Sequence, residues 1–231
     1  MLNGIRILGQ AKNALIKQHE IIANNLANLG TVGFKKDAVA FHRILDEKSN
    51  EVLVSVVKTD AGTGDFKQTS NPLDFSIQGE GYFSIQTPQG TRYTRDGSFQ
   101  INDKGILIDQ NGNPVLSEKG NIVISPELKG KVSVGLDGRV SIGTTDLGKL
   151  LISNFKEGAQ LIKTGENLFD VPNAEFTPGA FQVIQGSLEM SNSNSVQEMV
   201  EMMDALRLFE TSQTTARMGD EALGKAISQL A

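Results

Sequence analysis

The chain has 231 residues, of which 39% are hydrophobic, and its net charge at neutral pH is −5. Nucleic-acid binding needs a clustered basic surface, and the longest basic run here is Lys35-Lys36, so this class is not expected. Because the chain contains no cysteine, disulfide bonds, thiol catalysis and cysteine-ligated metal sites are excluded.

The beginning of the chain does not read as a secretory signal, because Asn3, Arg6 and Gln10 interrupt its apolar residues. No run approaches the ~18 apolar residues that a membrane span requires. The sequence therefore predicts no membrane insertion, and any export would use a route that does not read a cleaved signal.

Residues 1–29 form the first predicted element, a helix. Their apolar residues recur with helical spacing, and Gly30 and Gly33 then supply a stop. Leu8, Leu15, Ile22 and Leu29 lie seven apart. This spacing is typical of a heptad seam that packs one helix against another.

Residues 34–70 are expected to form an extended linker or hairpin, and residues 71–189 a β-rich domain. Turn dipeptides such as Asp96-Gly97, Asn111-Gly112 and Asp137-Gly138 favour type I′ hairpins. The pattern predicts antiparallel strands folded into a sandwich or irregular barrel. The short apolar runs between the turns lie at 82–85, 91–94, 99–101, 106–108, 122–124, 132–134, 139–142, 149–155, 168–171 and 181–185.

Residues 195–231 return to a helical pattern, and the polar run 191–195 before them offers several N-cap candidates. Two heptad rows run along this predicted helix. The first contains Met199, Leu206, Gln213, Asp220 and Ile227, and the second contains Met202, Phe209, Ala216, Leu223 and Leu230.

The predicted fold class is α+β, with two terminal helices forming a coiled-coil-like element around an inserted antiparallel β domain. Residues 1–33 and 190–231 would form this helical core together. Residues 1–48 carry seven basic and four acidic groups, a net charge of +3, whereas residues 189–231 carry three basic and seven acidic groups, a net charge of −4. The two ends are therefore electrostatically complementary, and surface left uncovered on the two helices would be covered by lateral partners.

None of the motifs that could carry chemistry is complete. His19 and His42 lie near no nucleophile signature, which favours ordinary surface or packing roles. The run beginning at Asp109 resembles a calcium loop but has Pro114 where glycine is required and Gly120 where glutamate is required, so a hairpin turn is expected instead. Gly79-Glu-Gly81 lacks the third glycine of a dinucleotide loop. We therefore expect no cofactor, no metal site and no enzymatic activity.

Four collinear blocks resemble the bacterial flagellar rod, hook and hook-associated proteins. They are residues 23–28 with Thr31, Gly33, Phe34 and Lys35; residues 71–83; residues 93–99; and residues 186–189 with Ser191, Asn192, Met199 and Val200. The chain departs from the family pattern at Leu29-Gly30 and at Ser193. Only 36 residues separate Phe34 from Asn71, and this short spacing is most similar to a proximal rod subunit. A distal rod or hook-type subunit of the same family is the alternative, and a secreted enzyme with a β domain is a remote one.

The resemblance implies a structural subunit of the flagellar basal-body rod, which polymerises into the periplasmic drive shaft between motor and hook. Its implied partners are other copies of itself, other axial rod proteins and the type III export apparatus. Two sets of residues are expected to form the assembly interface. In the N-terminal helix they are Leu8, Leu15, Ile22, Asn24, Asn25, Leu26, Asn28 and Leu29, and in the C-terminal helix they are Met199, Met202, Leu206, Phe209, Gln213, Ala216, Leu223, Ile227 and Leu230.

Overall fold

We analysed a computed structural model of the chain, which describes residues 2–45, 51–125, 130–156, 158–172 and 174–230. For residues 2–8, 11, 41–45, 51–55, 220 and 222–230 the backbone alone is described. The chain divides into two compact units. Unit 1 comprises residues 1–28, 36–60 and 193–231, and unit 2 comprises residues 29–35 and 61–192.

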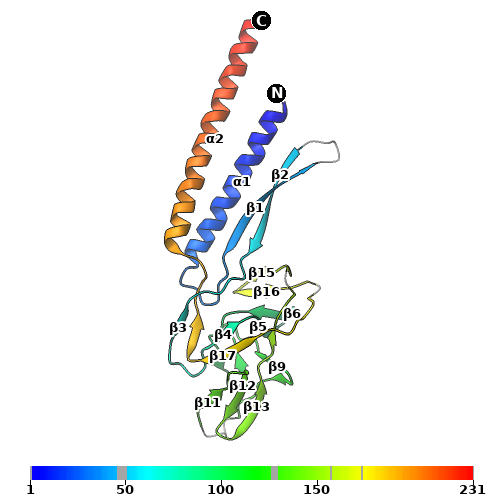
Figure 1. Cartoon of the computed structure of the whole chain (residues 1–231), viewed down its shortest axis with the longest axis vertical. Helices are drawn as coiled ribbons and strands as arrows, with labels where there is room; N and C mark the ends of the chain where they lie inside the picture. Colours follow the sequence, from blue (N-terminus) through cyan, green and yellow to red (C-terminus); the bar gives the residue numbers. More distant parts are fainter. Residues whose placement is uncertain (1, 46–50, 126–129, 157, 173, 231) are drawn as a thin grey trace. The chain divides into compact units, whose positions relative to one another are not determined.

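Unit 1 contains the two helices and one β-hairpin. Helix α1 spans Leu2–Ala27 and helix α2 spans Ser195–Leu230. The helices lie side by side and antiparallel (Figure 1). Strands β1 (Asp37–Leu45) and β2 (Glu51–Thr59) pair antiparallel, in continuous register from Asp37 opposite Thr59 to Leu45 opposite Glu51, and the hairpin packs against α1.

Unit 2 is built from short antiparallel strands. A five-stranded sheet, in the order β14-β5-β6-β16-β15, forms its largest element. A three-stranded sheet has the order β11-β12-β13, and the pairs β17-β4, β18-β3, β7-β8 and β10-β9 complete the unit. The strand bounds are β3 Phe66–Gln68, β4 Phe75–Gly79, β5 Tyr82–Thr87, β6 Gly90–Thr94, β7 Gln100–Ile101, β8 Leu107–Ile108, β9 Leu116–Ser117, β10 Gly120–Asn121, β11 Val132–Val134, β12 Arg139–Ile142, β13 Thr145–Lys149, β14 Ile152–Ser153, β15 Ile162–Gly165, β16 Leu168–Asp170, β17 Phe181–Gln185 and β18 Ser187–Glu189.

One contiguous apolar core lies at the centre of unit 2. Phe75, Ile77, Phe83 and Ile85 are fully enclosed, and the Phe83 ring packs edge-on against Phe99 with their centroids 5.1 Å apart. Such aromatic pairs add to the stabilisation that burial provides. The core thereby joins β4 and β5 to the segments around them.

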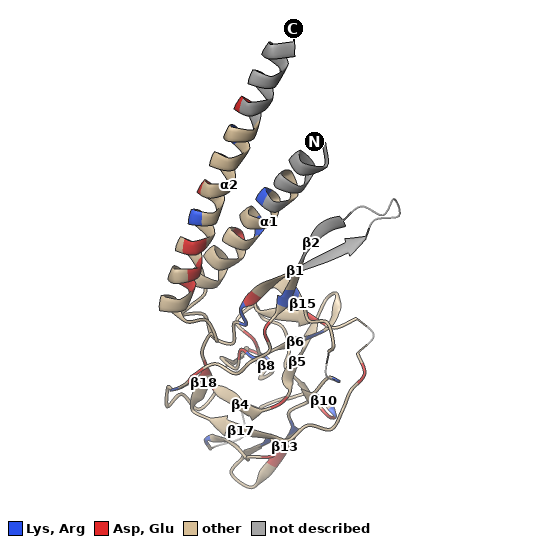
Figure 2. Cartoon of the chain, turned by 45° about the horizontal axis from the view of Figure 1, so that its top comes forward, with Lys and Arg blue, Asp and Glu red and all other residues tan. Residues whose placement is uncertain are grey.

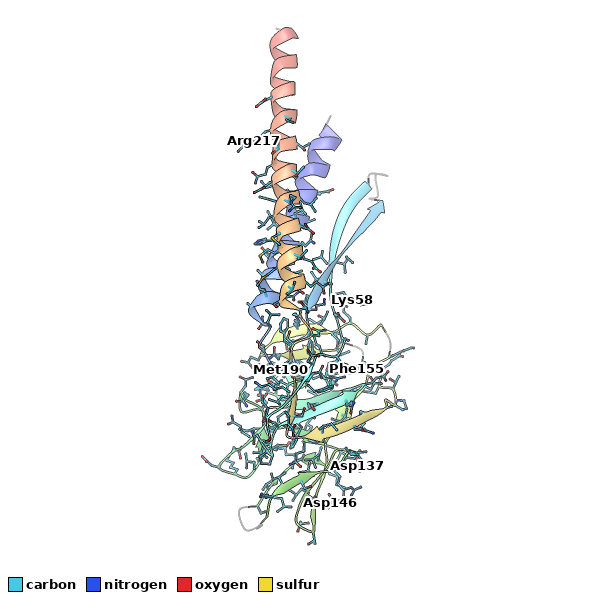
Figure 3. All side chains as sticks on the ribbon, turned by 60° about the vertical axis from the view of Figure 1, so that its left-hand side comes forward. Lys58, Asp137, Asp146, Phe155, Met190 and Arg217 are labelled. Carbon is cyan, nitrogen blue, oxygen red and sulfur yellow. The ribbon has the colours of Figure 1, made fainter. Side chains whose placement is uncertain are left out.

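A second, smaller cluster in unit 2 is mainly aromatic. It contains Tyr82, Tyr93, Phe169 and Val171. The ring of Phe155, which is labelled in Figure 3, packs edge-on against Tyr93 with their centroids 4.7 Å apart. Both tyrosines of the chain therefore lie in unit 2.

The predicted fold class is confirmed in its coarse form, because the structure is α+β with two helices and mostly antiparallel strands. The prediction of a strand at 122–124 is wrong. Ile122 and Ile124 are buried and Val123 is exposed, as in a strand, but Val123 makes only an isolated bridge to Ile106. Within residues 149–155, the strand β14 is limited to Ile152–Ser153.

Candidate assembly surfaces

The predicted interface residues of α1 occupy different sides of the helix. Ile22 is buried, and Leu15 and Leu26 are half-buried. Asn24 is exposed, whereas its neighbour Asn25 is buried. Asn28 and Leu29 are half-buried just beyond the helix, and the side chain of Leu8 lies outside the described residues.

Asn25 joins three elements of unit 1 through its side-chain amide. Its Nδ2 donates to the Asp37 carbonyl oxygen at 2.9 Å, and its Oδ1 accepts from the Asp37 N–H at 3.0 Å. The amide therefore forms with the Asp37 backbone the same pair of hydrogen bonds that a residue of a neighbouring strand would form. Nδ2 also donates to Glu198 Oε2 at 3.2 Å, which ties α2 to the same point. Because a buried amide needs partners for both its ends, this position is specific for asparagine.

One face of α2 packs toward α1. Of the predicted residues, Met202, Phe209 and Ala216 are half-buried, and all three belong to the same heptad row. Ala205 is almost fully buried next to this row. Lys12 of α1 lies over the Phe209 ring, with Nζ 5.7 Å from the centroid, in a cation–π contact. The described residues of this row therefore pack within the subunit.

The described part of the other predicted row of α2 faces outward, since Met199, Leu206 and Gln213 are exposed. Together with their apolar neighbours, Met199 and Leu206 form what we call the outer stripe. Its five side chains are 45–70% exposed, and they are Val196, Met199, Val200, Met203 and Leu206. Their spacing of three and four residues is that of a helix–helix seam. The side chains of Leu223, Ile227 and Leu230 lie outside the described residues.

The charges on α2 are mostly negative. The sequence of α2 contains six acidic residues and three basic ones, and the basic residue Arg207 pairs with Asp204 at 3.7 Å. Figure 2 shows this distribution along α2. The acids flank an apolar surface, a combination found in helices whose partners are other helices.

Two polar residues organise unit 1, and the sequence pattern pointed to only one of them, Asn194 within the polar run 191–195, whereas it gave no signal for Glu198. Glu198 is buried and receives the Asn25 amide, and Lys36 Nζ lies 4.0 Å from its Oε1. Asn194 caps α2, because its Oδ1 accepts from the N–H groups of Val196 and Gln197 at 3.0 and 3.2 Å. The polar run at 191–195 was the only signal for this cap.

The motifs considered for chemistry have structural roles. Asp109 Oδ1 accepts from the N–H groups of Asn111 and Asn113 at 2.9 and 2.8 Å and so closes a hairpin turn. Gly79 has a φ of +104°, and a Cβ there would lie 2.4 Å from the Ala180 oxygen. His19 is half-buried on α1, and the side chain of His42 lies outside the described residues.

The described residues contain no group of three or more histidines and carboxylates arranged to hold a metal ion. Neither helix, as far as it is described, is long and apolar enough to cross a membrane.

Comparison with protein families gives three matches along the chain. Residues 5–35 match the flagella basal body rod protein model, and residues 76–142 match the flagellar hook protein FlgE/F/G D1 domain. Residues 184–230 match the C-terminal model of the flagellar basal body rod FlgEFG proteins.

Individual relatives match over nearly their whole length. The chain is 32% identical over 235 residues to the flagellar basal-body rod protein FlgF of Mesorhizobium japonicum, covering 96% of this chain and 97% of that protein. It is 32% identical over 241 residues to FlgF of Rhizobium meliloti, covering 100% and 98%. It is also 31% identical over 237 residues to the basal-body rod protein FlgG of Buchnera aphidicola, covering 89% and 91%.

Proposed function

This chain belongs to the family of flagellar basal-body rod proteins, and from that premise we propose how it works as a rod subunit. Its role as a structural rod subunit and not an enzyme, which the sequence predicted, is confirmed by this membership. We propose that subunits polymerise through their terminal helices, and that residues 1–33 and 190–231 form the coiled-coil-like axial core of the polymer. The polymer would then transmit torque along the rod.

The outer stripe of α2 is the observation that carries this proposal. Burying one such side chain stabilises an assembly by roughly 1.5–3 kcal/mol, so five of them outweigh much of the entropic cost of association. Monomeric proteins rarely leave a contiguous apolar surface of this kind unoccupied. The partner that fits best is a helix of a neighbouring axial subunit, because the stripe has the spacing of a helix–helix seam.

We propose a heterologous contact, in which the stripe of one subunit packs against a different helical surface of the next, because a contact of stripe against stripe would close into a dimer and end the polymer. A heterologous contact that does not close into a ring continues as a helical tube. The neighbours would be other copies of this chain and other axial rod proteins.

The place and route of assembly belong to the same proposal. We propose that the subunit is exported unfolded through the type III apparatus without a cleaved signal, and that it assembles in the periplasm. The absence of cysteine supports this, since no stray disulfide can form in an oxidising compartment.

Within the rod we propose a proximal position. The short spacing between the first two sequence blocks supports it, as does the match to the two FlgF proteins over 97% and 98% of their lengths. The relatives reported above are named as basal-body rod proteins, which does not favour a hook-type subunit. Cross-linking in isolated basal bodies identifies the axial neighbours and distinguishes a proximal from a distal position.

The test of the outer stripe is the variant Met199→Glu/Met203→Glu in the full-length chain. We expect the monomer to keep its helical circular dichroism, because both side chains are exposed, and to be absent from purified basal bodies. Leu136→Glu/Val123→Glu is the matched control, since it places the same two charges on exposed apolar residues of unit 2. Incorporation of Met199→Glu/Met203→Glu at the level of this control would overturn the proposal.

A further inference from the structure

Unit 2 is connected to the rest of the chain by three segments, residues 29–35, 61–65 and 189–192. Lys35 and Glu189 lie in two of these segments, and both side chains are fully buried. The Lys35 Nζ atom lies 2.5 Å from Glu189 Oε1. Arg95, which follows β6 and is 4% exposed, donates from Nη1 to Glu189 Oε2 at 3.0 Å. These three side chains form a buried ionic cluster inside unit 2.

The cluster also bonds to the backbone of the connecting segments. Lys35 Nζ donates to the Gly62 oxygen at 2.7 Å, and the Gly64 N–H donates to Glu189 Oε1 at 3.1 Å. The Gly33 N–H donates to the Glu189 carbonyl oxygen at 2.7 Å. Each of the three segments is therefore bonded to Lys35 or Glu189.

Arg95 anchors this arrangement to the body of unit 2. Its Nη1 donates to the Ile77 oxygen at 3.0 Å and its Nη2 to the Gly79 oxygen at 2.7 Å, both on β4. Gly33 approaches the same region so closely that a Cβ on it would lie 2.3 Å from the Asp96 nitrogen, and its φ is +67°. Segment 29–35 is thus seated on the β structure, although in sequence it continues α1.

We propose that the Lys35–Glu189–Arg95 cluster is a clamp that holds the three connecting segments as one body. A force that reaches unit 2 through one of the three connecting segments is then shared with the other two segments, and Arg95 transmits it to β4. In the rod this clamp would strengthen each subunit against torque, a role that rests on the proposed function. The clamp itself is a property of the single chain.

The charges of the cluster make the clamp more sensitive to the loss of Glu189 than to the loss of Lys35. Of the three groups, two are cations and one is an anion. Replacing Glu189 leaves two cations side by side, whereas replacing Lys35 leaves the neutral pair Arg95–Glu189. Since a buried charge that loses its partner is strongly destabilising, Glu189→Gln should weaken the clamp far more than Lys35→Met. Adding Lys35→Met to Glu189→Gln should relieve part of the damage.

Hydrogen exchange of the purified full-length chain tests this. In Lys35→Met we expect exchange to rise about tenfold in all three connecting segments together, while β5 and β6 keep their protection. In Glu189→Gln the rise should be about a hundredfold or more, or the unit should fail to fold. Lys67→Met, which changes an exposed lysine of β3, is the control and should leave exchange unchanged.

Two results would overturn the clamp. One is faster exchange confined to residues 29–35 in Lys35→Met, because the segments would then be held independently. The other is a double variant less stable than Glu189→Gln alone, because the charge argument would then be wrong. Exchange in the monomer requires no assembly, so these outcomes are independent of whether the outer stripe variants enter basal bodies.

Discussion

The two units of this chain are stabilised in different ways. Unit 2 encloses a contiguous core, in which Phe75, Phe83 and Ile85 are inaccessible to solvent. The described part of the helices in unit 1 buries few large side chains and leaves the outer stripe of α2 exposed. Isolated helices depend on tertiary burial for their stability. Unit 2 is therefore complete as a monomer, whereas we propose that unit 1 is completed by neighbouring subunits.

Spectroscopy can separate the two units. Both tyrosines, Tyr82 and Tyr93, lie in unit 2, and the chain has no tryptophan, so tyrosine fluorescence and the tyrosine band of the near-ultraviolet circular dichroism report on unit 2 alone. The 222 nm signal is dominated by α1 and α2. Each variant below is therefore expected to change one signal and leave the other.

The largest effect is expected from Phe83→Ala in the core of unit 2. Removing a fully buried phenylalanine that packs on Phe99 should lower the free energy of unfolding by about 3–5 kcal/mol. Urea unfolding followed by tyrosine fluorescence measures this. Phe176→Ala is the control, because Phe176 is 61% exposed and its loss should cost less than about 1 kcal/mol. Equal costs for the two would contradict the core assignment.

The next effect is expected from Asn25→Asp in unit 1. The change removes the donor to Asp37 and Glu198 and adds a second buried carboxylate beside Glu198, so it should cost about 2–4 kcal/mol. We expect the 222 nm signal to fall while the tyrosine signal stays unchanged. Asn24→Asp, at the exposed neighbouring position, should leave both signals intact.

A smaller effect is expected at the start of α2. Asn194→Ala removes the acceptor for two N–H groups and should destabilise the helix by about 1 kcal/mol. Asn194→Asp keeps the acceptor and adds a negative charge at the helix N-terminus, where it is favourable. Thermal unfolding at 222 nm should therefore place Asn194→Ala below the parent chain and Asn194→Asp at or above it. A melting temperature higher for Asn194→Ala than for Asn194→Asp would contradict the assignment of Asn194 as the N-cap of α2.

The smallest effect is a pH dependence in unit 2. Burial raises the pKa of Asp96 above its ordinary value of 3.8, an effect that hydrogen bonds from Ser98 partly oppose. Since the folded state holds this proton more tightly than the unfolded state, stability falls as pH rises from 3.8 through the raised pKa and is constant above it.

Asp96→Asn removes this charge and keeps an acceptor for Ser98. We therefore expect the variant to be more stable than the parent chain at pH 7. The difference should vanish near pH 3, where Asp96 is protonated in both states. Urea unfolding at the two pH values measures it, and a difference that persists at low pH would refute the assignment to this carboxylate.

Much of the fold could be predicted from the sequence, because the heptad spacing and the Asp-Gly and Asn-Gly turns are local signals. The side of α2 that faces α1 was harder to identify. The pattern gave two rows without showing which of them faces α1. The structure exposes Met199 and Leu206 of the first row, and it buries Ala205 and Glu198, which belong to neither row. A buried carboxylate and its partner lie 173 residues apart, and hydrophobic spacing carries no signal for such a pair.

The clamp, too, could not be predicted from hydrophobic spacing. Lys35, Arg95 and Glu189 each stand in a block that carries the family resemblance, but the sequence does not show that three charged side chains meet inside a β unit. Buried charges are rare unless they are paired, and pairing is set by the tertiary fold. The sequence thus identified the blocks, and the structure supplied the reason for their charged residues.

The central claim is that unit 1 is completed by neighbouring subunits on the outer stripe. Because the chain has no cysteine, a maleimide photo-crosslinker can be attached to one introduced cysteine, at Met203 in the outer stripe or at the adjacent Met202 on the side facing α1. In isolated basal bodies we predict intersubunit adducts from Met203→Cys and few from Met202→Cys. Equal yields from the two positions, or adducts from Met202→Cys alone, would contradict the claim.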